Sequence, residues 1–288
     1  MSSLKNKIDF VMLFTVNNAN PNGDPLMGNM PRTDYEGYGE VSDVCIKRKI
    51  RNRMQDLKQD IFVQSGDRIK DGHNSLEARF DAHFDRKKKI PDATVDKDSC
   101  KKWMDVRSFG QVMTFQKRAL GIRGPVSISL AKSLNPVDVI TLQITRSTNG
   151  MRAEEGKARS SDTMGNKHYV EFGTYKLTGS INCYFAEKTG FTDEDADIIK
   201  EALRTLFVND MSSARPEGSM EVKKVYWFKH PNKLGIASSA KIHRLIQTDI
   251  KPDIDKVKQY EDYVIKIDEE RFNNYRQLGL ELEELDGI

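Results

Sequence analysis

The chain of 288 residues contains only three cysteines, Cys45, Cys100 and Cys183, which lie far apart in the sequence. An odd, scattered set of this kind provides no disulfide framework and no C-x-x-C pair for a zinc knuckle. Free cysteines are typical of proteins that work in a reducing compartment. We therefore expect the protein in the cytoplasm.

Long apolar runs are also missing. No stretch approaches the roughly 18 apolar residues that a membrane-spanning helix needs. The opening residues MSSLKNKIDFVMLFTV contain an aspartate inside their short apolar run and no small-residue cleavage site, so we expect no secretory signal. The composition is 38% hydrophobic and 31% charged, which is typical of one large domain or of a domain with sizeable insertions.

The common signatures of enzyme sites are absent as well. The sequence contains neither a phosphate-binding G-x-x-x-x-G-K-[ST] loop nor the motifs G-x-S-x-G and H-E-x-x-H. Asn20, Asn22 and Asp24 alternate as in a calcium loop, but Pro25 and Pro31 occupy the positions where an EF-hand needs Gly and Glu. We therefore expect no metal, no cofactor and no catalytic residue.

Positive charge is small in total, +3, but it is unevenly distributed. Residues 253–288 carry eleven acidic and five basic side chains, so the other 252 residues have a net charge of +9. The segment from Lys47 to Lys58 contains six basic residues and one acidic residue. Such clustering is typical of proteins that bind a phosphate backbone, although a solvated helix face shows the same pattern.

The order of periodic segments predicts an α+β fold. Alternating apolar residues over 8–16 predict a mostly buried strand, and spacings of three and four over 46–61 predict a helix with basic residues beside its apolar stripe, at the edge of the open face of a sheet. Further strands are expected over 124–131, 140–145, 175–185 and 225–228, and a second helix is expected over 192–207. This order approximates the ferredoxin-like β-α-β-β-α-β plan of RNA-recognition domains.

Three segments interrupt this plan. Residues 64–100 are polar and contain the basic run RKKK, which predicts an inserted loop region with a short helix. Residues 146–168 are polar and lie between two predicted strands, which predicts a hairpin with a projecting arm. The acidic segment 253–288 ends in ELEELDGI, which could form a solvated helix or contact another subunit.

One stretch matches part of an RNA-binding signature. RSFGQVMTF at 107–115 can be aligned with the pattern K/R-G-F/Y-G/A-F-V-x-F/Y, with agreement at Arg107, Phe109, Gly110 and Val112. Arg107 and Phe109 are therefore candidate RNA contacts. A buried Phe beside a flexible Gly, and an arginine that anchors a loop, explain the same residues.

Four short motifs follow one another along the chain. They are NPNGDP at 20–25, NMPRTD at 29–34, VSDVCIKRKIRN at 41–52 and DVRSFG at 105–110. Together they resemble the Cas7 family (a RAMP family), the backbone subunit of the CRISPR Cascade surveillance complex, and the wording of the second and third motifs most resembles its type I-C branch. The close match covers roughly the first 130 residues, and the strand–arm–strand order that follows agrees in layout.

The resemblance implies an RNA-recognition-like palm, inserted finger segments that include 64–100, and a long hairpin thumb over 146–168. Copies of such a subunit line up head to tail along one CRISPR RNA (crRNA), hold its backbone and display its bases for pairing with a target DNA strand, while other Cascade subunits cap the ends. Each thumb folds over the RNA held by a neighbouring copy and displaces one nucleotide at a regular interval. The implied thumb contacts are Arg152, Arg159, Met164, Lys167 and His168.

A protein that holds any guide sequence needs contacts to phosphates and 2′-hydroxyls rather than to base edges. Short amides can donate or accept hydrogen bonds, a glycine lets backbone N–H groups approach a phosphate, and basic side chains neutralise phosphates. On this basis the candidate RNA contacts outside the thumb are Asn20, Asn22, Gly23, Arg32, Lys47, Arg48, Arg51, Arg107 and Phe109.

Two other functions remain open at this point. Relatives in other CRISPR branches cleave RNA with an aspartate on a palm loop, and Asp24 and Asp34 are the matching candidates for a metal-dependent endoribonuclease. A single RNA-binding module unrelated to CRISPR is the third reading. Such a module would show base preference and would bind as a monomer.

Overall fold

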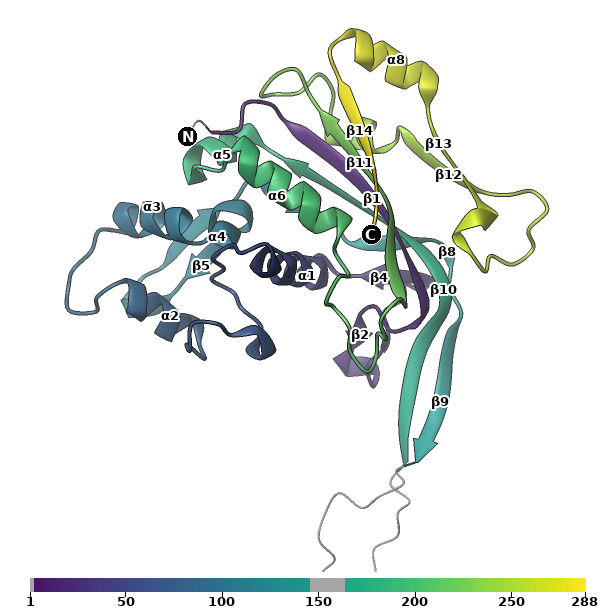
Figure 1. Ribbon diagram of the computed structural model, residues 1–288, viewed down its shortest axis with the longest axis horizontal. Helices are drawn as coiled ribbons and strands as arrows, with labels where there is room; N and C mark the ends of the chain where they lie inside the picture. The colour runs from purple at the N-terminus through teal and green to yellow at the C-terminus, as the bar shows by residue number, and fades with distance from the viewer. Residues whose placement is uncertain (1–2, 146–163) are drawn as a thin grey trace, which may run out of the picture.

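The computed structural model describes residues 3–145 and 164–288 (Figure 1). Two of the predicted thumb contacts, Arg152 and Arg159, lie outside the described residues. Among the described residues, no helix has both the length and the apolar character that crossing a bilayer requires.

One antiparallel sheet forms the centre of the described structure. Eight of the described strands form it, in the order β14–β11–β1–β10–β8–β4, and β7 and β9 also pair with β10. The strands are β1 (Ile8–Ala19), β4 (Tyr38–Val41), β7 (Val126–Ile128), β8 (Ala131–Pro136), β9 (Val139–Thr145), β10 (Met164–Ile181), β11 (Met220–Lys229) and β14 (Glu281–Asp286). All these pairings are antiparallel. The predicted combination of helices with an antiparallel sheet is confirmed.

Two helices, α1 (Asp43–Asp56) and α6 (Asp193–Arg204), lie on one face of the sheet (Figure 1). Their apolar residues, among them Ile46 and Ile199, belong to the same buried cluster as Phe10 of β1. α6 begins where the sequence predicts, whereas α1 begins three residues before the predicted start at residue 46. Their N-cap residues, Thr192 and Ser42, accept hydrogen bonds from the backbone of the first helical turn. Both predicted helices are present, but α1 ends at Asp56 and not at residue 61, and α6 ends at Arg204 and not at residue 207.

The opposite face of the sheet is covered by the C-terminal part of the chain. Val11 and Leu13 of β1 are fully buried in a second cluster with residues of this part. Its elements are α7 (Ser239–His243), β12 (Ile246–Ile250), β13 (Tyr263–Ile267) and α8 (Glu269–Gln277). The expectation of an open sheet face is therefore wrong at the central strand, where both faces carry core residues.

A third buried cluster lies in residues 62–123, which we call the inserted unit. Its elements are α2 (Leu76–His83), α3 (Asp92–Lys102), α4 (Met104–Phe109), β5 (Gly110–Met113) and β6 (Leu120–Arg123). Phe62, Phe80, Phe84 and Trp103 pack together in its core. The sequence predicted only loops and one short helix over 64–100. That prediction is wrong because single large aromatic residues, rather than a periodic apolar stripe, provide this core.

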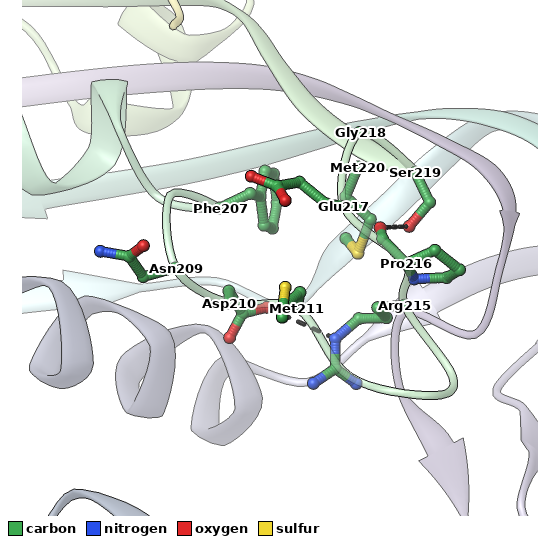
Figure 2. A pocket seen from close by; sticks show the side chains of 10 residues that line it. All are labelled: Phe207, Asn209, Asp210, Met211, Arg215, Pro216, Glu217, Gly218, Ser219 and Met220. Atoms are coloured by element: carbon green, nitrogen blue, oxygen red, sulfur yellow. Dashed lines mark hydrogen bonds and ion pairs between the residues drawn. The ribbon is translucent and has the colours of Figure 1, made fainter.

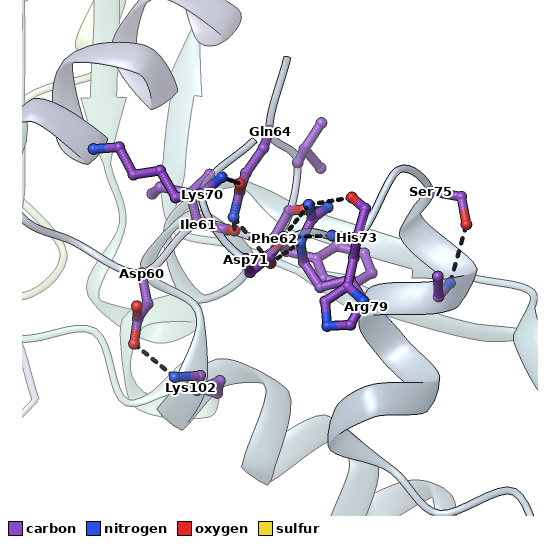
Figure 3. A network of polar contacts seen from close by, with 12 residues as sticks. Asp60, Ile61, Phe62, Gln64, Lys70, Asp71, His73, Ser75, Arg79 and Lys102 are labelled. Atoms are coloured by element: carbon purple, nitrogen blue, oxygen red, sulfur yellow. Dashed lines mark hydrogen bonds and ion pairs between the residues drawn. The ribbon is translucent and has the colours of Figure 1, made fainter. Parts of the chain in front are cut away.

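Arg79 of α2 holds the loop that precedes its helix (Figure 3). Its guanidinium is buried and donates hydrogen bonds to the carbonyl oxygens of Phe62 (2.8 Å) and His73 (2.9 Å). It also forms a bidentate pair with the carboxylate of Asp71, at 2.5 and 2.9 Å. The hydrogen bond from Arg79 lowers the pKa of Asp71 to about 2. The loop is thus closed by one charge-assisted contact.

We expect this contact to weaken in acid. The pKa of Asp71 falls from 3.8 to about 2 on folding, so its stabilisation is complete above 3.8 and is lost as the pH falls toward about 2. The free energy of unfolding, measured with urea at about pH 5 and about pH 3, should therefore fall less in acid for Asp71→Asn than for the wild type. Asp67→Asn, an exposed aspartate of the same loop, is the control. An equal acid-induced loss in Asp71→Asn and the wild type would contradict the assignment.

The last strand, β14, pairs with β11 along the edge of the sheet. Leu282 packs with the cluster on one face of the sheet and Leu285 with the cluster on the other. Each leucine therefore contacts a different face of the sheet, as alternating side chains of a strand do. The helix reading of ELEELDGI is therefore wrong. Acidic side chains along this exposed edge also disfavour pairing with foreign strands.

A two-stranded extension projects from the sheet at the N-terminal end of β10 (Figure 1). β9 pairs with β10 from Val139↔Val170 to Thr145↔Met164. We call β9 together with residues 164–170 of β10 the arm. The hairpin pairing is as predicted, but β10 begins at Met164 and not near Tyr175, so the predicted contacts Met164, Lys167 and His168 lie on a strand.

Two smaller pieces complete the described structure. β2 (Gly23–Asp24) and β3 (Met30–Pro31) form a short hairpin between β1 and α1, around a 3-10 turn at Pro25–Met27. A short helix, α5 (Cys183–Thr189), follows β10 and ends at Gly190, which adopts the left-handed conformation that favours glycine.

Candidate nucleic-acid interface

The stretch NNANPNGDP connects β1 to the β2–β3 hairpin, and its amides are used inside the protein. The buried Asn20 donates from Nδ2 to the carbonyl oxygen of Asn29 (2.7 Å), and Oδ1 of Asn22 accepts from the backbone N–H of Ser42 (2.9 Å). Since Ser42 caps α1, Asn22 ties the loop to the start of this helix. Both residues therefore shape the loop, and their contact with RNA stays a prediction.

Gly23 is required by packing within the same loop. A Cβ atom at this position would lie 2.0 Å from Oδ1 of Asn29, closer than any real contact. The glycine thus makes room for an asparagine side chain of its own hairpin. A close approach to a phosphate is a separate role that stays a prediction.

Arg32 lies at the base of the β2–β3 hairpin, opposite Asp24. Nη1 of Arg32 is 3.2 Å from the carboxylate of Asp24, which also accepts from the backbone N–H of Leu26 (3.0 Å). About a third of the Arg32 side chain stays exposed. The pair holds the hairpin closed while one side of the guanidinium faces solvent.

Asp34, the second candidate for nuclease chemistry, is also engaged. It accepts hydrogen bonds from the backbone N–H groups of Glu36 (3.0 Å) and Tyr38 (2.9 Å), and it lies 2.5 Å from Nζ of Lys132. The hydrogen bond from Lys132 lowers the pKa of Asp34. The carboxylate therefore organises a turn and pairs with a lysine of β8.

The basic residues of α1 have different surroundings. Lys47 pairs with Asp43 one turn away (3.0 Å), and Lys49 is fully buried in an ion pair with Asp210. Arg48 is exposed, and within the part of the chain that the structure describes it has no ion-pair partner. Arg48 is thus the residue of this helix best placed to neutralise a phosphate.

Arg51 connects α1 to the inserted unit. Its Nε donates to Asp105 (3.1 Å), and its guanidinium lies over the ring of Phe109, 5.0 Å from the ring centre. Asp105 is buried and also accepts from the backbone N–H groups of Phe62 (2.7 Å) and Val63 (3.0 Å). The guanidinium of Arg51 therefore has a structural partner inside the chain, and phosphate contact by this residue stays a prediction.

Arg107 has a similar anchoring position. It forms a bidentate pair with Asp195 at the start of α6, at 2.8 and 2.9 Å, and donates to the carbonyl oxygen of Cys100 (3.3 Å). Phe109, at the end of α4, is partly buried against the main core. The anchoring alternative for Arg107 thus matches the geometry.

The partial RNA-binding signature at 107–115 lies outside the central sheet. In RNA-recognition domains this signature occupies a central strand whose aromatic residues stack on bases. Here the segment spans α4 and β5, and β5 pairs with β6 in a separate two-stranded sheet. The signature match is therefore wrong.

The arm provides exposed residues of mixed chemistry. Met164 is 62% exposed, Lys167 is exposed, and Nδ1 of His168 lies 2.8 Å from the hydroxyl of Thr141 on the paired strand. These three residues lie on the same projecting hairpin, far along the chain from α1. Contact of these residues with RNA stays a prediction.

A family model described as "CRISPR-associated protein Cas7" matches residues 6–268. The chain belongs to this Cas7 family. A curated relative, also named "CRISPR-associated protein Cas7", from Haloferax volcanii, is 25% identical over 217 residues, which cover 67% of this chain. The match spans 61% of the length of that relative.

Two solved structures also resemble this Cas7 chain. One is titled "CRISPR RNA-guided surveillance complex, pre-nicking", with a TM-score of 0.48, 15% identity, and coverage of 77% of this chain and 78% of the other. The second is titled "CRISPR RNA-guided surveillance complex", with a TM-score of 0.44, 17% identity, and coverage of 77% and 68%.

A cluster of polar residues beside the NNANPNGDP loop of this Cas7 chain was not identified from the sequence (Figure 2). The segment 207–220 lines a pocket of about 250 Å³ and contains Asp210, which pairs with Lys49 and lies 3.4 Å from Nε of Arg215. The backbone N–H of Asn20 donates to the carbonyl oxygen of Ala214, so this segment adjoins the NNANPNGDP loop. A single arginine in an irregular loop shows no pattern that would single it out.

The two basic residues of this cluster have different environments. Burial lowers the pKa of Lys49, although Asp210 opposes the shift. Lys49 is therefore a core ion-pair partner and does not belong to the cationic surface that its position in VCIKRKIRN suggested. Arg215 is partly buried beside Asp210.

We expect Arg48 to contribute measurably to the salt dependence of RNA binding. A lost phosphate contact flattens the slope of log K against log salt by about 0.7 for a single strand. Arg48→Ala should show this change, measured by fluorescence anisotropy over a salt series. Lys241→Ala, an exposed lysine on α7, is the control with equal charge loss. Equal slopes for Arg48→Ala and the wild type would exclude the contact.

Proposed function

We propose that this Cas7 chain is the crRNA-binding backbone subunit of a type I Cascade complex, of the I-C branch. It polymerises along the guide RNA and presents the bases for pairing with a target DNA strand in antiviral defence. The observation that carries the proposal is the Cas7 family match over residues 6–268, which includes all four motifs. The complex would work in the cytoplasm, with other Cascade subunits at its ends.

The strand order supports an RNA-recognition-like palm. The chain passes through β1, α1, β8, β10, α6 and β11, and these strands lie in the order β11–β1–β10–β8. This is the order that the split β-α-β-β-α-β plan produces, with both helices on one face. Because the other face is covered at β1, the guide would not lie on the central strands. It would follow the side of the palm that carries the NNANPNGDP loop, Arg32 and Arg48.

The two additions to the palm fit the remaining roles. The inserted unit, with its own core, would serve as the finger, and the arm would serve as the thumb. Identical subunits that grip successive lengths of one strand must contact each other head to tail, and such contacts give an open filament unless rotation closes them. The length of the RNA would then limit growth.

The nuclease alternative has less support. Asp24 pairs with Arg32 and Asp34 pairs with Lys132, so each carboxylate already has a cationic partner. Within residues 3–145 and 164–288, no three His, Cys, Asp or Glu side chains are grouped so that they could hold a metal ion. We propose a holding role without catalysis. Cleavage of bound RNA with added divalent metal, abolished by Asp24→Ala or Asp34→Ala, would favour the nuclease.

Membership of the Cas7 family excludes a module unrelated to CRISPR, and RNA assembly tests the remaining proposal. The purified chain should carry RNA from the expression host. After this RNA is removed, the number of bound copies should rise stepwise with the length of an added RNA, and two unrelated sequences of equal length should give the same result. One copy per RNA at every length, or a strong base preference, would refute the proposal.

A further inference from the structure

The acidic C-terminal segment contacts the base of the arm. The loop between β12 and β13 carries Lys256, whose Nζ lies 2.9 Å from Asp138 and 2.8 Å from Glu171. Asp138 directly precedes β9, and Glu171 lies on β10 directly after the paired part of the arm. These two hydrogen bonds raise the pKa of Lys256, which keeps the ammonium charged.

Further contacts join the same parts of the chain. The hydroxyl of Tyr263, at the start of β13, donates to Oδ1 of Asn135 on β8. Nζ of Lys176 on β10 donates to the carbonyl oxygen of Ile246 on β12 (2.7 Å). The C-terminal part of the chain therefore contacts β8, β10 and the residue before β9, and its contacts with Asp138 and Glu171 lie at the base of the arm.

The loop that carries Lys256 is itself well held. The carboxylate of Asp262 is buried and accepts from the backbone N–H groups of Lys258 (2.8 Å) and Gln259 (3.1 Å). The backbone N–H of Lys251 donates to the carbonyl oxygen of Asp262 (2.9 Å). A pocket of about 290 Å³ separates the loop from the arm base, with Phe172 and Val257 in its lining. The ion pairs of Lys256 and the hydrogen bond from Tyr263 to Asn135 therefore join the loop to the arm base beside this pocket.

We propose that residues 251–263 brace the arm, and that Lys256 is the positioning residue that sets the angle between the arm and the palm. Among the described strands, β9 pairs only with β10, so the sheet itself gives the arm no second support. Ion pairs between half-exposed groups contribute little to global stability, but they are sufficient to bias the orientation of a hairpin that is attached at one end. This assigns a role to the C-terminal segment.

The orientation can be measured on the protein alone. Spin labels at Thr145→Cys on the arm and Asp197→Cys on α6, in a Cys45→Ser background, report the distance between arm and palm by pulsed electron resonance. The wild type should give one narrow distribution, and Lys256→Ala should give a broad one at an unchanged melting temperature. Lys233→Ala removes an equally exposed lysine paired with Glu187 and is the matched control. An unchanged distribution in Lys256→Ala would overturn the brace.

Charge reversal tests whether the ion pairs of Lys256 hold the arm in one orientation. Asp138→Lys with Glu171→Lys replaces both partners of Lys256 with like charges, so it should broaden the distance distribution. Adding Lys256→Glu to this variant should restore the narrow distribution, and a distribution that stays broad would count against the ion pairs as its cause.

The consequence for assembly rests on the proposed function. If the braced orientation is populated about a tenth of the time in Lys256→Ala, the apparent affinity for assembly on RNA falls about ten-fold. Failure of the wild type itself to assemble would refute the proposed function and leave the distance result standing. Unchanged assembly in a variant with a broad distribution would show that the arm angle set by Lys256 has no role in assembly.

Discussion

Deletion of residues 150–166 should abolish assembly of this Cas7 chain on RNA while the protein stays folded. Residues 170–181 of β10 pair with β1, so the deletion leaves the central sheet intact. The deletion removes the predicted contacts Arg152, Arg159 and Met164. Light scattering on an RNA long enough for several copies should show at most isolated bound copies, and circular dichroism should show an unchanged melting transition.

A control of equal length makes this result specific. Replacing residues 150–162 with a Gly/Ser linker keeps the length of the chain but removes the side chains of this segment, including both arginines. We expect this variant also to fail in assembly, because the predicted contacts Arg152 and Arg159 depend on their side chains and not on the length of the segment. Normal filament formation by the deletion variant would refute the role of the arm.

Asp105→Ala should cause the largest loss of stability among single substitutions outside the apolar core. The substitution leaves the backbone N–H groups of Phe62 and Val63 without their acceptor and the partly buried Arg51 without its partner. Removal of one partner from a buried ion pair costs about 3–5 kcal/mol. Urea unfolding followed by tryptophan fluorescence should report this change, because Trp103 lies in the adjacent cluster.

Two comparisons test the cause of that loss. Asp60→Ala removes an exposed carboxylate that pairs with Lys102, and we expect a change of about 1 kcal/mol or less. Asp105→Asn keeps one acceptor oxygen but loses the charge, so its effect should lie between the two. If Asp105→Ala is no more destabilising than Asp60→Ala, Asp105 does not connect α1 to the inserted unit.

The elements that the sequence predicted most accurately are those that depend on local patterns. Thr192 and Asp195 form the capping box at the start of α6, and the apolar alternation of residues 8–16 corresponds to β1. Such features depend on neighbours within a few residues along the chain. The hairpin of β9 and β10 also followed from two alternating segments around a polar one.

Candidate contacts were harder to predict because several cations are committed to partners distant in sequence. Arg51 pairs with Asp105, 54 residues away, and Arg107 pairs with Asp195, 88 residues away. Lys49 belongs to the same basic run as Arg48, yet it is buried against Asp210 while Arg48 is exposed. A charge count along the sequence cannot distinguish these cases.

The sequence by itself determined the central strand, the two capped helices and, through four ordered motifs, the Cas7 family, because these depend on short-range periodicity and on linked residue types. Only the tertiary structure decided which faces of the sheet are closed, that ELEELDGI is an edge strand, and that the C-terminal segment reaches the base of the arm. These features arise from contacts between segments that lie far apart in the sequence, where burial and charge pairing outweigh local preference.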